Sequence, residues 1–496
     1  MTPHSGPIMG HQSRIAGMLG VKEFAGLGLK GLTSDSRKVK PGYLFAALSG
    51  TKTDGARFVK DAVARGAVAV LGAPALADDV VALGVRFIAD ENPRAGLAHL
   101  ASMFFTGQPE IVAAVTGTKG KSSIVAFLRE IWTALGKPAA SLGTVGVVGP
   151  KGEIPLSHTT PDPVEIHEIL SRLKQDGVDH LAIEASSHGL DQHRLDGVRI
   201  SGCGFTNITR DHMDYHPSFE DYLAAKLRLF TEVVKDGGVA VVNADAEHAS
   251  RFIDAATMRG LRLITVGRKG DTIRLDRRED RGGAQALTLH YQGQIYYIEL
   301  PQAGEFQASN ALVAAGLAIG LGEDAAKVFA ALETLKGAPG RMEKVAVSAE
   351  GAPVYVDYAH TPDSLEKVLE ALRPHTANRL HLVFGCGGDR DRGKRPLMGA
   401  IAVRLADDVI VTDDNPRTED PAAIRREILA AARGAREIAD RAHAIRAAVA
   451  DLKMGDVLIV AGKGHETGQY VKGEVHPFSD REQAIAAAIA LGGRAA

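Results

Sequence analysis

The sequence predicts an α/β protein built from three domains. The chain has 496 residues, and one hydrophobic core rarely grows beyond about 250–300 residues. Short apolar runs of strand length alternate with helical segments, which favours parallel sheets covered by helices. A glycine-rich loop at residues 116–122 stands between one such strand and a helix. Hydrophobic residues make up 45% and charged residues 24% of the chain, which is typical of a folded globular protein.

Charge and cysteine content exclude several classes of function. The chain carries 58 basic and 60 acidic residues, for a net charge of -2, so no nucleic-acid partner is expected. Its two cysteines, Cys203 and Cys386, form no CxxC pair, which argues against zinc sites and favours the reducing cytoplasm. We find no signal-peptide pattern and no apolar run of about 20 residues, so we expect no membrane span. No coiled-coil seam is evident, and we expect a monomer.

The first predicted domain covers residues 1–108. Residues 44–48 and 67–71 read as short buried strands, and residues 58–65 read as a helix that ends at Gly66. Gly107, Gln108 and Pro109 form a plausible linker to the next domain.

The second predicted domain covers residues 109–338. It opens with a strand at residues 111–115, followed by the glycine-rich loop and a helix at residues 122–135. Further strands are expected at residues 181–183 and 239–242. Strand, glycine loop and helix in this order are the layout of a nucleotide-binding α/β unit.

The third predicted domain covers residues 339–496. Strands are expected at residues 354–356, 380–384, 409–411 and 457–460, with helical segments between them. This alternation predicts a Rossmann-like parallel sheet with helices on both faces. Such sheets bind ligands at the carboxyl ends of their strands, and polar motifs do follow the apolar runs here.

The glycine-rich loop carries the features of a phosphate-binding site. Glycines let backbone N–H groups approach phosphate oxygens, and the helix N-terminus adds partial positive charge. Lys121 can reach the β- and γ-phosphates of ATP, and the Ser122 hydroxyl can bind Mg²⁺. The usual spacing fails because Val115 occupies the position of the first glycine. The loop therefore predicts a P-loop-type ATPase domain, and the alternative is a tight turn with an incidental lysine.

The loop resembles the ATP loop of the Mur ligase family and its relative folylpolyglutamate synthetase, which share this variant spacing. Four further motifs match in order across all three domains. They are residues 184–190, residues 207–216, the Gly304-x-Phe306-x-x-x-Asn310 pattern, and the pair of segments at residues 340–343 and 357–362. No single motif carries the resemblance.

The resemblance implies an ATP-dependent acid–amino-acid ligase of cytoplasmic peptidoglycan precursor synthesis, which forms an acyl phosphate before the amine attacks. The match is closest to family members that add meso-diaminopimelate to UDP-N-acetylmuramoyl-L-alanyl-D-glutamate, because residues 414–417 read Asp-Asn-Pro-Arg. Diaminopimelate carries a carboxylate that lysine lacks, and the planar Arg417 guanidinium can pair with it bidentately.

The resemblance also implies roles for residues that bind ATP and metal. Lys121, Glu184, His212 and Lys226 are the implied catalytic residues. Lys226 corresponds to a carbamylated lysine (N6-carboxylysine), although a helical lysine is usually a solvated surface residue. Ser122, Glu184 and His212 are the implied Mg²⁺ ligands, although a loop histidine is more often a polar surface residue. The implied ATP-binding residues are Thr116, Gly117, Thr118, Lys119, Gly120, Lys121, Ser122, Asn310, Arg341 and Asp357.

Two further groups are implied to bind the other substrates. The UDP-substrate set is Ser34, Ser36, Thr51, Lys52, Thr53, Thr159, Thr160, Ser186, Gln192 and Arg194. The diaminopimelate set is Arg390, Asp414, Asn415, Pro416, Arg417, Gly462 and Glu466. Serine and threonine clusters are also common in turns and caps, and the second set has an alternative reading as a surface ion-pair cluster.

Two competing functions stay open at this point. One is another ligase of the same superfamily, adding glutamate to folates or a different amino acid to the wall precursor. The other is a nucleotide-binding regulatory protein that has lost catalysis. The Asp-Asn-Pro-Arg segment argues against the first, and the intact set of implied catalytic residues argues against the second.

Overall fold

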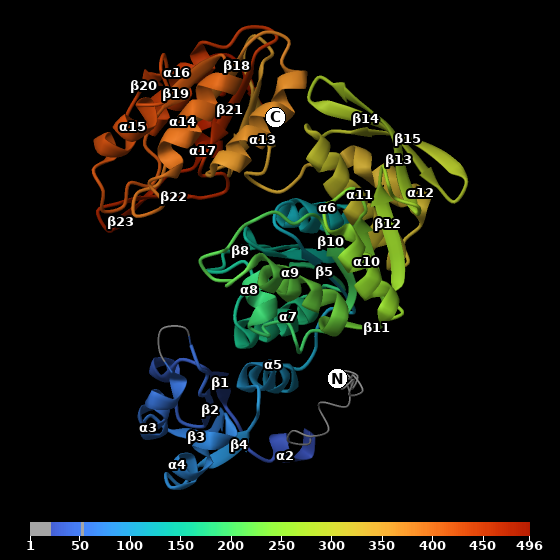
Figure 1. The fold of residues 1–496 in the computed structure, drawn as a ribbon, viewed down its shortest axis with the longest axis vertical. Coiled ribbons are helices and arrows are strands. Elements are labelled where there is room, and N and C mark those ends of the chain that lie inside the picture. Colours follow the sequence, from blue (N-terminus) through green and yellow to red (C-terminus); the bar gives the residue numbers. More distant parts are fainter. Residues whose placement is uncertain (1–20, 51–53) are drawn as a thin grey trace, which may run out of the picture. The chain divides into compact units, whose positions relative to one another are not determined.

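The computed structural model describes residues 21–50 and 54–496 (Figure 1). The described residues form two compact units, one made of those up to residue 273 together with 313–328, the other of residues 274–312 and 329–496. Each contains β-sheets whose strands are connected by helices, as the sequence predicts. No helix in the described part of the chain is long and apolar enough to cross a membrane.

The first unit begins with a four-stranded parallel sheet in the order β1-β2-β3-β4. The predicted strands at residues 44–48 and 67–71 are confirmed as β2 and β3 within two residues. The predicted helix at residues 58–65 is confirmed as α3, which follows a 3₁₀ turn at Gly55–Phe58. The elements are α2 (Val21–Ala25), β1 (Gly31–Thr33), β2 (Tyr43–Ala46), α3 (Val59–Ala64), β3 (Ala67–Gly72), α4 (Ala77–Val81), β4 (Arg86–Ala89) and α5 (Pro93–Phe104).

The first unit continues with strands in the order β12-β11-β10-β5-β9-β6-β7-β8. Strands β12 to β6 are parallel, while β7 and β8 extend the edge in antiparallel fashion, so the sheet is mixed. The bounds are β5 (Ile111–Thr116), β6 (Ala139–Gly143), β7 (Gly146–Gly149), β8 (Gly152–Ile154), β9 (His180–Glu184), β10 (Ile200–Phe205), β11 (Val234–Asn243) and β12 (Arg262–Gly267).

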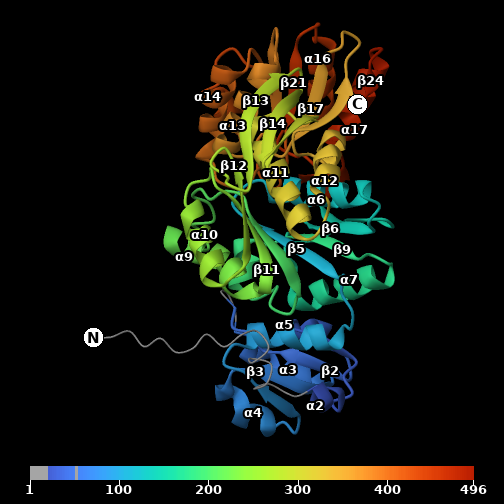
Figure 2. The ribbon, with the colours of Figure 1, turned by 90° about the vertical axis from the view of Figure 1, so that its right-hand side faces the viewer.

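Helices pack on both faces of this sheet, as the ribbon in Figure 2 shows. One core cluster joins alternate residues of β5, β9 and β10 to apolar residues of α7, α9 and α10. The helix predicted at residues 122–135 is α6, one residue earlier. The bounds are α6 (Lys121–Ala134), α7 (Pro163–Gln175), α8 (Ser187–Asp191), α9 (Phe219–Arg228) and α10 (Ala249–Met258).

The second unit contains an antiparallel meander that the sequence analysis did not predict. It consists of β13 (Ile273–Arg281), β14 (Ala284–Tyr291) and β15 (Gln294–Leu300). Gly282 and Gly283 form one of its turns and Gln292 and Gly293 the other, all with positive φ. Such two-residue turns are the usual hairpin signal. Helix α11 (Glu305–Gly320) begins in this unit, while its residues from 313 on and the start of α12 (Ala325–Ala331) belong to the first unit.

The C-terminal sheet has seven strands in the order β20-β19-β18-β21-β17-β16-β24. The strands from β20 to β17 are parallel, as predicted, while β16 and β24 are antiparallel additions. The bounds are β16 (Glu343–Val347), β17 (Pro353–Asp357), β18 (Leu380–Phe384), β19 (Asp408–Val411), β20 (Arg436–Glu437), β21 (Val457–Ala461) and β24 (Arg494–Ala495), with a separate hairpin of β22 (Gly468–Val471) and β23 (Glu474–Pro477).

Helices cover both faces of this sheet. Along β18, Leu380, Leu382 and Phe384 enter the core shared with α13, α14 and α15, while Val383 enters the core shared with α16 and α17. This alternation is the period of two expected of a strand buried on both faces. The helices are α13 (Pro362–Leu372), α14 (Lys394–Leu405), α15 (Pro421–Leu429), α16 (Arg441–Ala450) and α17 (Asp480–Ala490).

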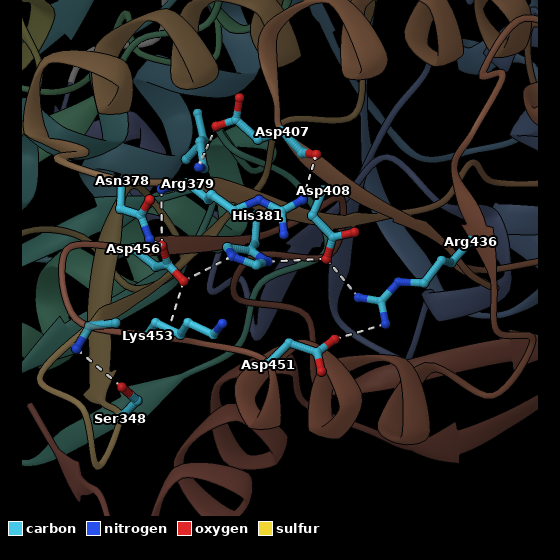
Figure 3. A network of polar contacts seen from close by, with 12 residues as sticks. Ser348, Asn378, Arg379, His381, Asp407, Asp408, Arg436, Asp451, Lys453 and Asp456 are labelled. Atoms are coloured by element: carbon cyan, nitrogen blue, oxygen red, sulfur yellow. Dashed lines mark hydrogen bonds and ion pairs between the residues drawn. The ribbon is translucent and has the colours of Figure 1, made fainter.

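The amino-terminal edge of this sheet is closed by a polar network (Figure 3). His381, at the start of β18, lies between Asp408 at 3.1 Å and Asp456 at 3.2 Å. Asp456 also accepts hydrogen bonds from the backbone of Arg379 at 2.9 Å and Lys453 at 2.8 Å. The carboxyl edge, by contrast, carries the loops that contain the predicted ligand-binding residues.

Candidate active site

The phosphate loop joins the end of β5 to the start of α6 and needs its glycines. Gly117 has φ +145° and Gly120 has φ +87°, which L-residues with a side chain rarely adopt. A Cβ atom on Gly117 would lie 2.2 Å from Thr206 Oγ1. Glycine therefore lets the loop pass close to the end of β10.

Contacts from the end of β10 hold the loop in shape. Asn207 O accepts a hydrogen bond from Thr118 N at 2.8 Å, and Asn207 Oδ1 accepts one from Lys119 N at 3.1 Å. Lys121 Nζ donates to the carbonyls of Gly117 and Thr118, both at 3.0 Å. Asn207 had no assigned role in the sequence analysis, although it belongs to one of the matched motifs.

Lys226 reaches the same loop from α9. Its Nζ donates to Gly117 O at 2.8 Å, and its side chain is buried. Burial, together with the nearby Lys121 ammonium, holds the pKa of Lys226 well below its usual value. Tyr222, one helical turn earlier, places its ring 4.5 Å from Nζ and its hydroxyl 2.9 Å from Thr118 Oγ1. The structure thus confirms the helix and brings Lys121 and Lys226 to one carbonyl.

Glu184 ends β9, next to β5, where its Cα partner is Val115. Only 1% of the residue is exposed. Its Oε1 accepts a hydrogen bond from Thr144 N at 2.8 Å, and Oε2 accepts one from the Thr144 hydroxyl at 3.3 Å. A buried carboxylate at the end of a strand beside the phosphate loop suits a divalent cation.

His212 belongs to a cluster of rings that the sequence analysis only partly identified. It has φ +56°, and its ring lies 4.9 Å from that of His188, which lies 5.7 Å from that of His216. Burial lowers the pKa of all three, and that of His188 falls to about 4. Neutral imidazoles can bind metal ions. Among residues 21–50 and 54–496, however, no three His, Cys, Asp or Glu side chains are grouped as a metal site.

Part of the predicted UDP-substrate set comes together near Glu184. Thr160 Oγ1 donates to Glu184 O at 2.8 Å and accepts from Ser186 N at 3.1 Å. The Arg194 guanidinium donates to Thr160 O and, at 2.8 Å, to Gln192 Oε1. Thr159 is joined to this group through the Thr144 hydroxyl at 3.0 Å. Ser186 also caps α8, which agrees with the alternative reading of these serines.

The N-terminal members of the set lie elsewhere. Ser34 follows β1, and Ser36 is buried in a 3₁₀ turn capped by Asp35. A cavity of about 410 Å³ lies at the carboxyl ends of β2 and β3, lined by residues that include Leu48, Asn92 and Arg94. Neither serine lines it. The predicted residues Thr51, Lys52 and Thr53 lie outside the described residues.

In the second unit, three predicted ATP-binding residues form two small groups. Asn310 Nδ2 donates to Gln307 Oε1 at 2.9 Å, and Gln307 Nε2 donates to Arg341 O at 3.4 Å. Asp357 ends β17 and accepts hydrogen bonds from Met342 N and Ala359 N, both at 2.7 Å. The Arg341 guanidinium lies 4.6 Å from the centre of the Tyr358 ring. Gln307 was missed, since its type and position gave no separate signal.

The loops after β19 and β21 bring together Asn415 and Glu466. Asn415 Nδ2 donates to Glu466 Oε2 at 2.9 Å. A buried lysine, Lys463, donates to the same Glu466 oxygen at 3.1 Å. Gly462, which begins the second loop, has φ +124°, and a Cβ atom there would lie 2.6 Å from Asp414 Oδ2. Lys463 lies between the predicted residues Gly462 and Glu466 and had no assigned role.

Arg417 follows Pro416 in the loop after β19 and contacts the loop after β18. It has φ +52°, and its guanidinium donates to Gly388 O at 2.8 Å. Its N–H donates to Tyr470 O at 2.9 Å. Arg390 is exposed in the loop after β18, where it donates to Asp389 O at 3.0 Å. Three loops at neighbouring strand ends therefore carry the predicted diaminopimelate residues.

Known proteins resemble this chain over most of its length. The pattern of the Mur ligase catalytic domain matches residues 28–105, that of the middle domain residues 115–318, and that of the glutamate ligase domain residues 340–464. A UDP-N-acetylmuramoyl-L-alanyl-D-glutamate--2,6-diaminopimelate ligase of Bradyrhizobium diazoefficiens is 58% identical over 470 residues, or 94% of this chain and 96% of that protein. The enzyme of that name from Agrobacterium fabrum is 53% identical over 95% of this chain and 96% of its own length.

Solved structures agree. A structure of UDP-N-acetylmuramoyl-L-alanyl-D-glutamate--2,6-diaminopimelate ligase is 34% identical and superposes with a TM-score of 0.70, covering 93% of this chain and 95% of that one. Folylpolyglutamate synthase of Mycobacterium tuberculosis, at 20% identity and a TM-score of 0.59 over 74% of this chain and 92% of its own, shares the fold alone. The resemblance seen in the sequence is confirmed: the chain belongs to the Mur ligase family.

Proposed function

We propose that the chain is the ATP-dependent ligase that adds meso-diaminopimelate to UDP-N-acetylmuramoyl-L-alanyl-D-glutamate in peptidoglycan synthesis. The observation that carries the proposal is the group formed by Asn415, Arg417 and Glu466 at the carboxyl edge of the C-terminal sheet. The relatives' names support the same reaction. We retain the division into domains at residues 1–108, 109–338 and 339–496 as part of the proposal.

The reaction needs a carboxylate to be activated before an amine can displace its oxygen. The γ-phosphoryl group of ATP passes to a carboxylate oxygen of the dipeptide, which gives an acyl phosphate and ADP. The amine nitrogen then attacks the acyl carbon, loses a proton, and expels inorganic phosphate. Phosphoryl transfer relies mainly on positioning and on charge neutralisation. Lys121, the loop N–H groups and the N-terminus of α6 supply both at the phosphates.

The residues beside the loop fit Mg²⁺. Ser122, Glu184 and His212 supply a hydroxyl, a buried carboxylate and an uncharged imidazole, and the buried Thr116 Oγ1 has no hydrogen-bond partner among the described residues. Bound Mg²⁺ neutralises charge that develops on the transferred phosphoryl group. Lys226, as N6-carboxylysine, adds an anion beside the phosphate loop, and its lowered pKa supports that modification because only the neutral amine combines with CO₂.

Charge explains the choice of amine. Diaminopimelate carries two carboxylates and two ammonium groups, and the loops offer the guanidinium groups of Arg417 and Arg390 together with the Glu466 carboxylate. L-Lysine would leave one guanidinium without its carboxylate partner, which is costly in a partly buried site. We place the nucleotide portion of the other substrate among Thr159, Thr160, Ser186, Gln192 and Arg194, with Ser34 and Ser36 as its N-terminal contacts.

We also place the reaction in the cytoplasm, in agreement with two buried free cysteines. The proposal is tested by incubating the protein with ATP, meso-diaminopimelate and the dipeptide labelled with ¹⁸O in its free carboxylates. An acyl phosphate transfers one label to inorganic phosphate, and mass spectrometry of the products detects both that transfer and the UDP-tripeptide. A tripeptide without label in phosphate overturns the acyl-phosphate step, and the absence of a tripeptide overturns the ligase assignment.

A further inference from the structure

Lys463 is a buried cation to which the proposed reaction assigns no part. It is the second residue of the loop after β21, and none of its side chain is exposed. Its ammonium donates to Asn415 Oδ1 at 2.9 Å, to Glu466 Oε2 at 3.1 Å and to Gly468 O at 2.7 Å. Because a buried ammonium is costly unless it is paired, a lysine at this position calls for an explanation.

These contacts use the whole donor capacity of Lys463. A lysine ammonium has three N–H donors and no acceptor, and here each faces one acceptor. The ammonium therefore has no N–H left for a substrate. A direct contact with substrate, or a part in proton transfer, is not what this geometry supports. Its effect passes through the two side chains that it holds.

The first effect is on the orientation of the Asn415 amide. Asn415 Oδ1 faces Lys463 Nζ at 2.9 Å and Tyr470 N at 3.1 Å. Both of these groups can only donate, so the atom that faces them has to be the amide oxygen. The NH₂ group is then directed to Glu466 Oε2. Without the lysine, one of the two contacts that select this orientation is lost.

The second effect is on Glu466. Asn415 and Lys463 both donate to the same oxygen, Oε2. Both donors contact Oε2, so Oε1 is the carboxylate oxygen that neither of these two residues occupies. A carboxylate held in this way presents negative charge to an ammonium group while its other oxygen is fixed.

We propose that Lys463 is a positioning residue for amine recognition, which fixes the Asn415 amide and the Glu466 carboxylate that receive the distal ammonium of diaminopimelate. This inference rests on the proposed function and deepens it. Lys463 and the two arginines then have different roles. Lys463 contacts Asn415 and Glu466 rather than the substrate, whereas the guanidinium groups of Arg417 and Arg390 are assigned to carboxylates of the substrate.

The test compares Lys463→Met with wild type, measuring the KM of each substrate and kcat by phosphate release. Loss of one partner of a buried charge pair costs binding strongly, so we expect the KM for meso-diaminopimelate to rise on the order of 30-fold. The KM values for ATP and the UDP-dipeptide should stay within about threefold of wild type, because neither is assigned to these loops. A rise in only the amine KM is a result that general destabilisation would not give.

A matched control is available in the same domain. His381 is buried at the opposite edge of the sheet, between two aspartates, so His381→Gln should lower the melting temperature without changing the KM for diaminopimelate. The proposal is overturned if the KM for diaminopimelate is the same in His381→Gln and in Lys463→Met. It is also overturned if Lys463→Met raises the KM values of all three substrates equally. If Lys463→Met does not fold, Lys463→Gln, which keeps N–H donors but removes the charge, takes its place with the same criteria.

A double-mutant cycle tests whether the effect passes through Glu466. If Lys463 acts by holding this carboxylate, Lys463→Met should raise the amine KM by less than about threefold in a Glu466→Gln background. Full additivity of the two effects overturns the positioning role. A wild-type protein that forms no product with meso-diaminopimelate would instead refute the proposed function, so the two failures are distinguishable.

Discussion

Lys226 Nζ donates a 2.8 Å hydrogen bond to Gly117 O, the first glycine carbonyl of the phosphate loop. This contact joins α9 to the loop between β5 and α6. It places a buried amine of lowered pKa directly beside the expected position of the ATP phosphates. Two lysines, Lys121 and Lys226, share that carbonyl.

We predict that Lys226 carries a carbamate. Burial and the neighbouring Lys121 lower its pKa, so a larger fraction of the amine is neutral at a given pH than in free lysine. Incubation with ¹³C-bicarbonate should give a carbamate carbon signal in NMR that Lys226→Gln lacks. Lys226→Gln should also lower kcat by about 100-fold or more, because the carbamate would no longer help to hold Mg²⁺ beside the phosphates. An identical spectrum in both proteins would contradict the modification.

Gly117→Ala should abolish productive ATP use. Only glycine adopts its φ of +145° at little cost, because any side chain would strain the backbone there. The new Cβ would also lie 2.2 Å from Thr206 Oγ1. The loop would have to move away from β10, so the affinity for ADP, measured by calorimetry, should fall by at least about tenfold. Gly136→Ala, at the C-terminus of α6 with open space around it and φ +76°, is a control for backbone strain alone. Equal ADP affinities in the two variants would refute this account of the loop.

Arg417 should decide between diaminopimelate and lysine. Its backbone is left-handed, with φ +52°, so alanine would combine loss of the guanidinium with strain, whereas asparagine tolerates this conformation. Arg417→Asn should therefore lower kcat/KM for meso-diaminopimelate about 30- to 150-fold, which corresponds to a rise of about 2–3 kcal/mol in activation free energy. The kcat/KM for L-lysine should change by less than about threefold. Equal losses for both amines would show that Arg417 does not read the extra carboxylate.

The network around His381 should make stability depend on pH. Burial raises the pKa of Asp456, but hydrogen bonds from Lys453 N and Arg379 N and the nearby His381 outweigh it, so the pKa lies below 3.8. A lowered pKa adds stability above the unfolded-state value, and this stability is lost as pH falls through the folded-state pKa. Asp456→Asn should lower the free energy of unfolding by about 1–3 kcal/mol at neutral pH.

The difference between wild type and Asp456→Asn should shrink as the pH falls from about 5 to about 3, because Asp456 of the unfolded chain takes up its proton at a higher pH than Asp456 of the folded protein. Urea unfolding at several pH values measures it. A difference that stays constant over this range would mean that the charge of Asp456 contributes nothing to stability.

The sequence predicted buried strands that are continuous apolar runs. It missed β6 and β10, which are buried but interrupted by serine or glycine, and it missed the charged meander. Residues 380–384 form β18 as predicted, because a continuous apolar run between polar loops is distinctive. The meander was missed because β13 is rich in charge from Arg274 to Arg281, and its apolar side chains are few. The signal that could have found it was the pair of two-residue turns at Gly282–Gly283 and Gln292–Gly293.

Some site residues received a role from the sequence, and others did not. Motif positions such as Asn415 and Glu466 could be named because the family resemblance implied them, and the structure does bring them together. Gln307, Asn207 and Lys463 received no role, because each acts by holding another group rather than by its own chemistry. Such contacts depend on which loops meet at a sheet edge, which the spacing of residues along the chain does not reveal.

The most direct test of the central claim is phosphate release from ATP with UDP-N-acetylmuramoyl-L-alanyl-D-glutamate, measured with meso-diaminopimelate, with L-lysine and without an amine. We predict rapid release only with meso-diaminopimelate, together with formation of the UDP-tripeptide. Equal release with L-lysine would contradict the assigned amine, and release that is the same with and without an amine would contradict the ligase itself.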